Sequence, residues 1–396
     1  MSAQGQNNSR MGIDADELAS CVQCGLCLPH CPTWRLSGDE NRSPRGRIDI
    51  LRSLEHGERT LDDDAVAALS SCIQCRACEP ACPSAVPFGR MIASATQTMV
   101  VEQPALVPRW LRVGLWSLGH PALTALATAA IRALGRMWRV PGAPRGLMDR
   151  VSRQRKWIEP FGSGDRVLLV RGCVMDGLQR SVHVDTVTCL EAVGFAPRSA
   201  DRAEGCCGAL AHHAGLVELG AAQATRFVSG FSGDAPIVTD SAGCGAHLKD
   251  LARVLGTTEA ERFASRVRDV GELLADRADR LPLIDGQRPR VAVADPCHLR
   301  HVQRAHEPMR AVLGRVVELV DLGDDGQCCG AGGAWAIRHP QDAAELRDAK
   351  LDRAGALGVQ CVVSGNPGCT MHLGGGPLRV SHPVEIIAEA IRAEHP

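Results

Sequence analysis

Two runs of closely spaced cysteines constrain this chain of 396 residues more than any other feature. Each run reads Cys-x-x-Cys-x-x-Cys-x-x-x-Cys-Pro. The first run holds Cys21, Cys24, Cys27 and Cys31, and the second holds Cys72, Cys75, Cys78 and Cys82. Thiolates at this spacing meet on one centre when the backbone wraps in a tight loop, and the proline after the fourth cysteine stops that loop. The pattern therefore predicts two metal-binding loops.

The spacing is that of bacterial ferredoxins with two [4Fe–4S] clusters. In that arrangement the first three cysteines of a run hold one cluster, and the fourth turns away to hold the other. We therefore expect cluster I to be held by Cys21, Cys24, Cys27 and Cys82, and cluster II by Cys72, Cys75, Cys78 and Cys31. The alternative metal is zinc, which prefers four ligands from two separated Cys-x-x-Cys pairs and fits this spacing less well.

The 40 residues between the runs (32–71) make this region longer than a compact ferredoxin. They include the basic sequence Ser43-Pro44-Arg45-Gly46-Arg47-Ile48. Its arginines either screen the negative charge of the clusters or are solvated. Small residues inside the loops, such as Gly25 and Ala77, let backbone N–H groups approach the cluster sulfides.

Cysteine is the unusual component of the composition, with 18 copies. The first ten residues are polar and lack the apolar stretch of a secretory signal. We therefore expect a cytoplasmic protein, in which thiols stay reduced and short cysteine spacings indicate metal. The net charge of −1, the 3% aromatic content and the absence of tyrosine argue against a nucleic-acid partner.

One uncharged segment, Val113–Ile131, approaches the length of a membrane span. It is interrupted at Gly119–Pro121, which predicts a buried helical hairpin broken at that point. The alternative is a peripheral segment at the inner face of the cell membrane, because tryptophan and arginine favour the lipid boundary. A true span is the least favoured of the three. The tryptophans and arginines in and around the segment are Trp110, Trp116, Trp138, Arg112, Arg132, Arg136 and Arg139.

From residue 166 onward, short apolar strands alternate with helical segments, which predicts an α/β fold. This region contains an internal repeat of one lone cysteine, a Cys-Cys-Gly triplet and a second lone cysteine. The repeated cysteines are Cys173, Cys206, Cys207 and Cys244 in the first copy and Cys297, Cys328, Cys329 and Cys369 in the second. The offsets between the first, second and last cysteines of the two copies are 124, 122 and 125 residues. We therefore expect two homologous lobes related by a pseudo-twofold axis.

The repeated cysteines are candidates for a further metal centre or for an acceptor site. They stand at strand ends or in glycine-rich turns, and open α/β sheets bind ligands at the carboxyl ends of their strands. His247 and His372 each follow the last cysteine of their copy by three residues. A thiolate set with one imidazole suits an iron–sulfur or zinc centre. The alternative is buried structural thiols, which is what we expect of Cys189 and Cys361 because they have no repeat partner.

These patterns predict an α+β and α/β chain, in which a helical two-cluster ferredoxin-like domain precedes two repeated α/β cysteine-rich lobes. The predicted divisions are a disordered tail (1–15), the two-cluster domain (16–100), a helical connector (101–160), the first lobe (161–285) and the second lobe (286–396).

Two ferredoxin-type runs followed by two such lobes resemble the iron–sulfur subunit of glycolate oxidase (glycolate dehydrogenase) over nearly the whole chain. The stretches Ser-Pro-Arg-Gly-Arg (43–47) and Asn-Pro-Gly-Cys-Thr-Met-His-Leu (366–373) are especially similar to that branch. Related subunits occur in anaerobic glycerol-3-phosphate dehydrogenase and heterodisulfide reductase. In heterodisulfide reductase the lobe motif ends in Cys-x-x-Cys and holds noncubane clusters. Here His247 and His372 replace that last cysteine, which argues against noncubane clusters and disulfide chemistry.

The resemblance implies an electron-transfer subunit with no catalytic residue of its own. A separate FAD-containing subunit would oxidise a 2-hydroxy acid such as glycolate or D-lactate, and a quinone or another acceptor would receive the electrons. No Gly-x-Gly-x-x-Gly follows a strand in this sequence, in keeping with FAD on a partner. Two alternatives stay open. One is a subunit resembling those of glycerol-3-phosphate dehydrogenase or heterodisulfide reductase, whose lobes act directly on quinone or disulfide. The other is a metal-stabilised scaffold without redox turnover.

Overall fold

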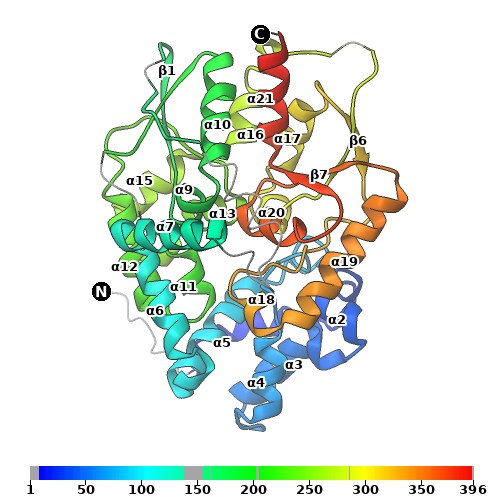
Figure 1. Cartoon of the computed structure of the whole chain (residues 1–396). Helices are drawn as coiled ribbons and strands as arrows, with labels where there is room; N and C mark the ends of the chain where they lie inside the picture. Colours follow the sequence, from blue (N-terminus) through cyan, green and yellow to red (C-terminus); the bar gives the residue numbers. More distant parts are fainter. Residues whose placement is uncertain (1–8, 138–154, 161, 202–204, 285, 395–396) are drawn as a thin grey trace.

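The computed structural model describes residues 9–137, 155–160, 162–201, 205–284 and 286–394. Two α/β lobes lie side by side, and a helical N-terminal region lies below them in the view of Figure 1. This region contacts the first lobe through α5 and α11 and the second lobe through α2 and α19. The predicted fold class, a helical N-terminal part followed by two repeated α/β lobes, is confirmed.

Short helices separated by the two cysteine loops make up the N-terminal region. They are α1 (Ala15–Ala19), α2 (Pro32–Ser37), α3 (Pro44–Glu55), α4 (Asp63–Ser70) and α5 (Phe88–Glu102), with 3-10 turns at Leu28–His30, Glu40–Arg42 and Pro104–Leu106. Capping residues set where they begin, because Ser43 accepts a hydrogen bond from the Gly46 N–H at 2.9 Å and Asp62 accepts one from the Ala65 N–H at 2.7 Å. Leucine, isoleucine and methionine side chains of α3, α4 and α5 form a common core.

Residues 9–15 are ordered, although the sequence predicts a disordered tail over residues 1–15. Met11 and Ile13 are buried in the core of this region. The Ser9 hydroxyl and the Met11 N–H both donate hydrogen bonds to the Glu55 carboxylate. Burial of apolar side chains and pairing of polar groups therefore order the chain from residue 9 onward.

The predicted helical hairpin is present, and its outward face is exposed rather than buried. Helix α6 (Arg109–Leu118) and helix α7 (Pro121–Met137) pack together, with the break at Gly119–His120. Leu111 and Leu115 face inward, while apolar side chains on the other side, such as Trp110 at 61% and Leu126 at 68%, face solvent. Trp138 and Arg139 lie outside the described residues. Among the described residues, no helix is long and apolar enough to cross a membrane.

The two lobes contain sheets of the same topology. The first sheet has the order β2-β1-β3-β4 and the second the order β6-β5-β7-β8, and every pairing is parallel. The strands are β1 (Asp165–Leu169), β2 (Phe195–Arg198), β3 (Ile237–Thr239), β4 (Val267–Asp269), β5 (Arg290–Val293), β6 (Glu318–Asp321), β7 (Cys361–Val363) and β8 (Arg379–Ser381). Apolar residues fill the central strands, as expected for parallel strands covered on both faces.

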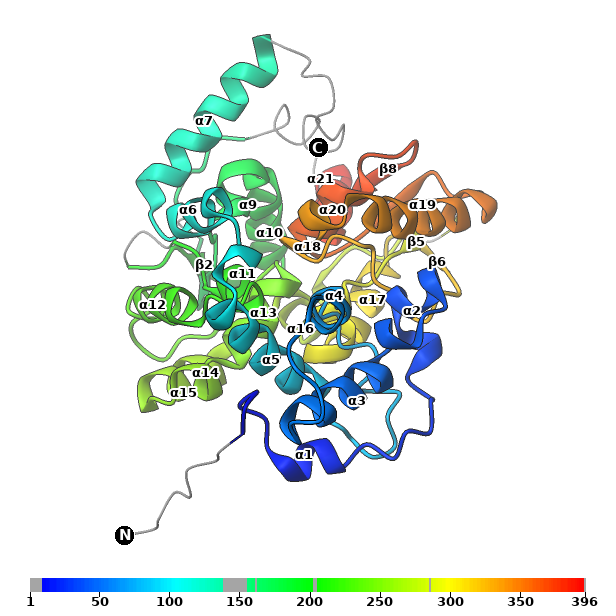
Figure 2. The same ribbon diagram turned by 90° about the horizontal axis from the view of Figure 1, so that it is seen from below.

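Helices cover both sheets (Figure 2). In the first lobe they are α9 (Val174–Leu178), α10 (Arg180–Ala192), α11 (Ala209–His213), α12 (Val217–Val228), α13 (Ala242–Lys249), α14 (Leu251–Leu255), α15 (Thr258–Arg266), α16 (Val270–Ala275) and a 3-10 turn at Ala278–Arg280. In the second lobe they are η5 (His298–Gln303, a π-helical turn), α17 (His306–Leu313), α18 (Trp335–Arg338), α19 (Pro340–Ala356), α20 (Pro367–Leu373) and α21 (Pro383–Glu394).

The lobes meet through reciprocal contacts. Helix α10 of the first lobe packs on α21 of the second, and α17, the counterpart of α10, packs on α16. The Gln179 side chain donates to the Pro367 carbonyl at the start of α20, and the Gln303 side chain donates to the Ala242 carbonyl at the start of α13. Each contact from the first lobe to the second thus has an equivalent contact in the opposite direction, as expected for two lobes related by an approximate twofold axis. Cys189 and Cys361 lie in the core shared by the two lobes, as predicted.

Candidate functional site

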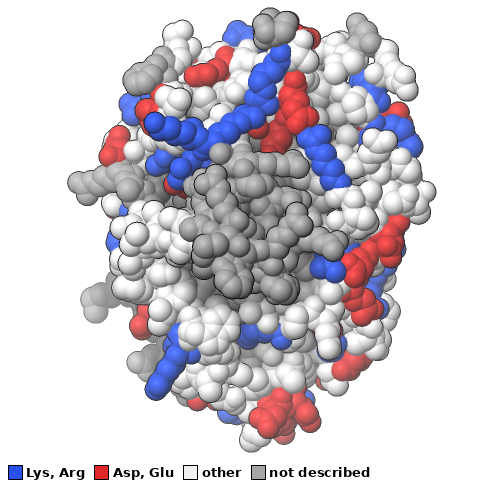
Figure 3. Space-filling model, viewed as in Figure 1, with Lys and Arg blue, Asp and Glu red and all other residues white. Residues whose placement is uncertain are grey.

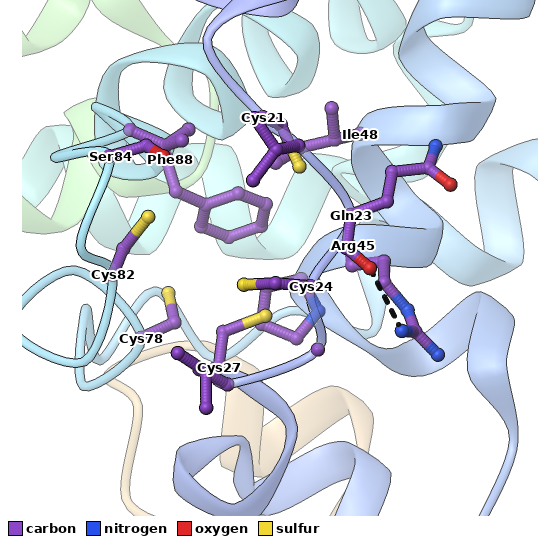
Figure 4. Close-up of a pocket in the computed structure, with 15 residues that line it drawn as sticks. Cys21, Gln23, Cys24, Cys27, Arg45, Ile48, Cys78, Cys82, Ser84 and Phe88 are labelled. Carbon is purple, nitrogen blue, oxygen red and sulfur yellow. Dashed lines mark hydrogen bonds between the residues drawn. The ribbon is translucent and has the colours of Figure 1, made fainter.

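The first cysteine loop (residues 21–27) forms one wall of a small cavity, which Figure 4 shows in close-up. Cys21, Cys24 and Cys27 line this wall. Cys82, the last cysteine of the second run, lies across the cavity from them, and Cys78 stands beside it. The fold therefore brings the fourth cysteine of the second run to the first three cysteines of the first run.

The second cysteine loop (residues 72–78) lies close to Cys31, the last cysteine of the first run. Burial raises the pKa of the Cys72, Cys75 and Cys78 thiols, and the neighbouring Cys31 thiol adds to the rise in all three. The Arg47 guanidinium reaches toward this group, with Nη1 at 3.9 Å from the Cys31 sulfur. The four cysteines of the expected second cluster are thus neighbours in space.

Both loops adopt left-handed backbone conformations at the same two positions. The φ angle is +58° at Gln23 and +83° at Gly25 in the first loop, and +60° at Gln74 and +61° at Arg76 in the second. When left-handed residues alternate with right-handed ones, successive backbone N–H groups point into one concave surface, called a nest, which binds anions. A cluster held by four thiolates carries negative charge, so the sulfur donors and the backbone of both loops fit a [4Fe–4S] cluster.

Arg45 and Arg47, from the basic sequence between the runs, have different surroundings. Arg47 is buried and donates hydrogen bonds to the hydroxyls of Thr33 and Ser71 at 2.9 and 2.8 Å. Arg45 is partly exposed and forms an ion pair with Glu40 at 2.7 Å. Arg47 is therefore fixed against the second cysteine group, whereas Arg45 reaches the surface beside the first.

Exposure also separates the two loops. In the first loop Cys24 is exposed, and its apolar neighbours Val22 and Leu26 are 69% and 56% exposed. In the second loop Ile73 and Cys75 are 6% and 8% exposed. The same cysteine spacing thus produces one loop that faces outward and one loop that is enclosed by the rest of the chain.

The second lobe encloses the second loop. Ile73 and Cys75 form one apolar cluster with Trp335 and Cys328, and Cys297 packs against it. The Trp335 indole donates a hydrogen bond at 3.1 Å to the backbone carbonyl that precedes the second run. After burial, the charge of the Cys297 thiol is the next contribution that raises the pKa of Cys75. The second loop therefore lies in direct contact with the cysteine set of the second lobe.

In each lobe the four repeated cysteines form a chain of thiol interactions. Neighbouring thiols shift each other's pKa in opposite directions. The interacting pairs are Cys173–Cys206, Cys206–Cys207 and Cys207–Cys244 in the first lobe and Cys297–Cys328, Cys328–Cys329 and Cys329–Cys369 in the second. No three His, Cys, Asp or Glu side chains within the described ranges are arranged to hold a single metal ion.

One large cavity lies where the lobes and the N-terminal region meet. Its volume is about 770 Å³, and all eight repeated cysteines line it, together with residues 72–74 of the second loop. Much of the remaining wall is apolar and includes Leu111, Leu115, Met175 and Trp335. Pockets for small molecules are typically about 300–1,000 Å³ and mostly apolar, so this cavity suits a ligand of moderate size.

The histidines that follow the two cysteine sets occupy different places. His372 lines the large cavity, and one of its ring nitrogens hydrogen-bonds to the Ala343 carbonyl at 2.9 Å. His247 lies in the wall of a second, more polar cavity. The structure therefore brings His372 to the cysteines of its lobe, and it directs His247 elsewhere.

Several residues around the cavities did not stand out in the sequence. Gln74 exchanges two hydrogen bonds with His213, at 2.7 and 2.9 Å, and so ties the second loop to the first lobe. Trp335 ties the same loop to the second lobe. Both runs read Cys-x-Gln-Cys, and this shared glutamine is the one sequence signal that points to Gln74. The contacts of His213 and Trp335 depend on packing between distant segments.

Comparisons with known proteins agree with these features. Residues 17–86 match the 4Fe-4S dicluster domain family, and residues 167–249 and 291–374 each match the cysteine-rich domain family. The chain is 24% identical to lactate utilization protein A of Bacillus pumilus (strain SAFR-032), over 58% of this chain and 99% of that protein.

Two further relatives match from end to end. The probable glycolate oxidase iron-sulfur subunit of Bacillus subtilis (strain 168) is 28% identical, over 97% of this chain and 96% of that protein. The glycolate oxidase iron-sulfur subunit of Escherichia coli (strain K12) is 32% identical, over 98% of each chain. The resemblance inferred from the cysteine motifs is confirmed, and the chain belongs to the family of glycolate oxidase iron–sulfur subunits.

Proposed function

We propose that this chain is the electron-transfer subunit of a flavin-dependent 2-hydroxy-acid dehydrogenase. A separate FAD-containing subunit oxidises the hydroxy acid, glycolate or D-lactate, and a quinone accepts the electrons. Support for glycolate comes from the names of the two end-to-end relatives, and support for lactate from the partial match to lactate utilization protein A.

The residues that hold the two [4Fe–4S] clusters in this proposal follow the crosswise ferredoxin pattern. Cluster I takes Cys21, Cys24, Cys27 and Cys82, and cluster II takes Cys72, Cys75, Cys78 and Cys31. When bound, the clusters supply one-electron transfer, while the chain tunes them by burial, backbone N–H groups and the Arg47 charge.

The contact between the second loop and the large cavity carries the proposal. Ile73 and Cys75 pack directly on the cysteines of the second lobe, and residues 72–74 form part of the cavity wall. A quinone in this cavity therefore lies next to the second loop. The apolar wall and the volume of about 770 Å³ both suit a quinone ring.

The exposed first loop is the side that the FAD subunit meets in this proposal. Val22 and Leu26 present apolar surface on either side of the exposed Cys24. An apolar patch rimmed by polar residues is typical of a protein interface. Electrons thus enter beside the first loop and leave beside the second.

The eight repeated cysteines and His372 are also the candidates for a further iron–sulfur or zinc centre. Metal analysis of the purified protein tests this point. About eight irons per chain means that only the two ferredoxin-type clusters are present, whereas additional iron or zinc means that the lobes hold metal.

We further propose that the exposed face of α6 and α7 meets a lipid surface. Residues 109–131 contain no acidic side chain. In Figure 3 the surface around α7 is mostly white, although charged side chains gather above it. The inner face of α6 lines the large cavity through Leu111 and Leu115, so the same hairpin connects the cavity with the outside. Membrane-dissolved quinone is a suitable ligand for such a site.

Vesicle flotation tests this contact. Replacement of Trp110 and Leu126 by serine is expected to reduce binding to anionic lipid vesicles, because both side chains are apolar and exposed. Ile158→Ser is the matched control, since Ile158 is 73% exposed outside the hairpin. Equal binding of all variants contradicts the proposed contact.

The electron-transfer function is tested on the anaerobically purified protein. Dithionite is expected to produce electron paramagnetic resonance signals of two [4Fe–4S] clusters, and a flavoprotein is expected to co-purify. A dithionite-treated sample without such signals contradicts electron transfer. A chain that oxidises glycolate with a dye and no flavoprotein contradicts the proposed division of labour.

A further inference from the structure

Four histidines from the two lobes form a row beside the cysteine sites, and at one end of it His298 Nδ1 lies 3.5 Å from the Cys297 sulfur. His212 and His213 stand at the end of α11, His247 lies in α13, and His298 begins η5. The ring centroids of His247 and His212 are 5.4 Å apart, those of His212 and His213 are 6.2 Å apart, and those of His213 and His298 are 5.5 Å apart. Each ring is thus the neighbour of the next, and no hydrogen bond joins two of these rings directly.

The row separates two cavities. On one side is the large cavity lined by the repeated cysteines. On the other side is a cavity of about 390 Å³. The charged residues that line this second cavity are Arg76, Glu79, Arg90, Asp250, Arg253 and Arg304. His213, His298 and Gln74 line both cavities, so they form the shared wall.

Several ring nitrogens in the row have no partner. His212 Nδ1, His247 Nε2 and His298 Nε2 are buried and make no hydrogen bond to any described residue. A buried polar atom without a partner costs free energy, so three of them in one group indicate a role beyond packing.

The hydrogen bonds of Gln74 fix the tautomer of His213. The Gln74 amide nitrogen donates to the His213 carbonyl at 2.9 Å, so its amide oxygen faces the His213 ring. That oxygen accepts from Nδ1 at 2.7 Å, which places the ring proton on Nδ1. The other nitrogen, Nε2, is therefore free to accept a proton.

Burial favours the neutral form of three rings in the row. Burial lowers the pKa of His213, and the neighbouring histidines and Arg76 lower it further. Burial also lowers the pKa of His212, and it lowers the pKa of His247 to about 3. A neutral imidazole can take up a proton at its unprotonated nitrogen and release it again, which is what proton transfer along the row requires.

We propose that His247, His212 and His213 carry protons from the polar cavity to a quinone bound in the cysteine-lined cavity. This inference rests on the proposed function. The quinone takes two electrons from the reduced clusters and two protons, one on each oxygen, and becomes a hydroquinone. His213 Nε2 takes each proton from the row and releases it to the quinone, while Nδ1 keeps its own proton in the hydrogen bond to Gln74. A proton from solvent in the polar cavity then enters the row to replace it.

Two acceptors with different proton requirements test the proposal. The dithionite-reduced holoprotein is mixed either with ferricyanide, which takes one electron and no proton, or with a water-soluble quinone. The variant His213→Gln is expected to reduce the quinone at least about tenfold more slowly than the unmodified protein, while the ferricyanide rate stays unchanged. In the variant His213→Ala, added imidazole is expected to restore quinone reduction.

Two measurements besides rates exclude indirect effects. The resonance signals of the clusters are expected to be unchanged in His213→Gln. The equilibrium affinity for a quinone analogue is measured for each variant, so that the rates are compared at saturating quinone. The control is His306→Gln, because His306 is partly buried in α17 and lines neither of the two cavities within the described chain.

Three results overturn the inference. If His213→Gln reduces both acceptors equally more slowly, His213 has a structural role. If His213→Gln reduces both at the unmodified rate, His213 does not transfer protons. If the unmodified protein reduces ferricyanide but not quinone, both quinone as the acceptor and proton transfer through the histidines are contradicted. That result is distinct from failure of the relay alone, in which the unmodified protein and His213→Gln reduce quinone equally fast.

Discussion

The two cysteine loops share one pattern and have opposite surroundings. Both have the same cysteine spacing and left-handed residues at the same two positions. The first loop, however, exposes Val22 and Leu26 to solvent, whereas the second loop buries Ile73 between the N-terminal region and the second lobe. The motif therefore determines the shape of a loop, and the packing around it determines what the loop can exchange electrons with.

Loss of one cysteine from each loop is expected to give the largest difference between them. Cys75→Ser is expected to remove the second cluster, leave about four irons per chain and lower the melting temperature, because this loop is also a packing surface for the second lobe. Cys24→Ser is expected to disturb the first cluster with little change in melting temperature, since Cys24 is exposed. Iron analysis and thermal unfolding measure both effects, and equal melting temperatures contradict the comparison.

Substitution of Arg47 or Arg45 is expected to give the next largest difference. Arg47→Met is expected to lower the free energy of unfolding by about 3–5 kcal/mol, because Thr33, Ser71 and the second cysteine group lose a buried charged partner. It is also expected to lower the reduction potential of the second cluster, since a nearby positive charge favours the added electron.

Arg45→Met is the matched control for Arg47. Its ion pair with Glu40 is partly exposed, so the expected loss is under about 1 kcal/mol. Denaturant unfolding and a redox titration followed by paramagnetic resonance give both quantities. Similar losses for the two variants would show that burial does not distinguish the arginines.

The apolar residues after the first cysteine of each run give a smaller, paired effect. Ile73→Ala is expected to lower the free energy of unfolding by about 2–4 kcal/mol, because it leaves a cavity beside Trp335 and Cys328. Val22→Ala is expected to change it by less than about 0.5 kcal/mol, since Val22 is exposed. Chemical denaturation of the holoprotein measures the difference. A large loss of unfolding free energy in Val22→Ala would contradict it, because it would show that Val22 packs against other residues.

The smallest expected effect concerns the partner. Val22→Ser with Leu26→Ser is expected to weaken binding to the FAD subunit by about 1–2 kcal/mol without loss of either cluster, because these side chains form the exposed apolar surface at the first loop. Titration of the flavoprotein against the variant measures the affinity. Unchanged affinity would place the partner on another surface.

Much of this arrangement is predictable from the sequence because it depends on local spacing. The loops follow from the cysteine runs, and the two lobes follow from offsets of 122 to 125 residues. The different surroundings of Arg45 and Arg47, or of His247 and His372, depend instead on which distant segment packs against each side chain. The sequence predicts the pair of helices in the hairpin, but it predicts them as buried. Their exposed face depends on which side of the hairpin packs against the rest of the chain.

Labelling with a photoreactive quinone tests most directly whether electrons leave beside the second loop. The reduced holoprotein is illuminated with an azido-quinone, with and without excess unmodified quinone, and the adducts are located by mass spectrometry. Competed adducts are expected on the cavity wall, in residues 107–118, 170–175 and 331–338. Competed adducts confined to residues 21–27 of the first loop would contradict it.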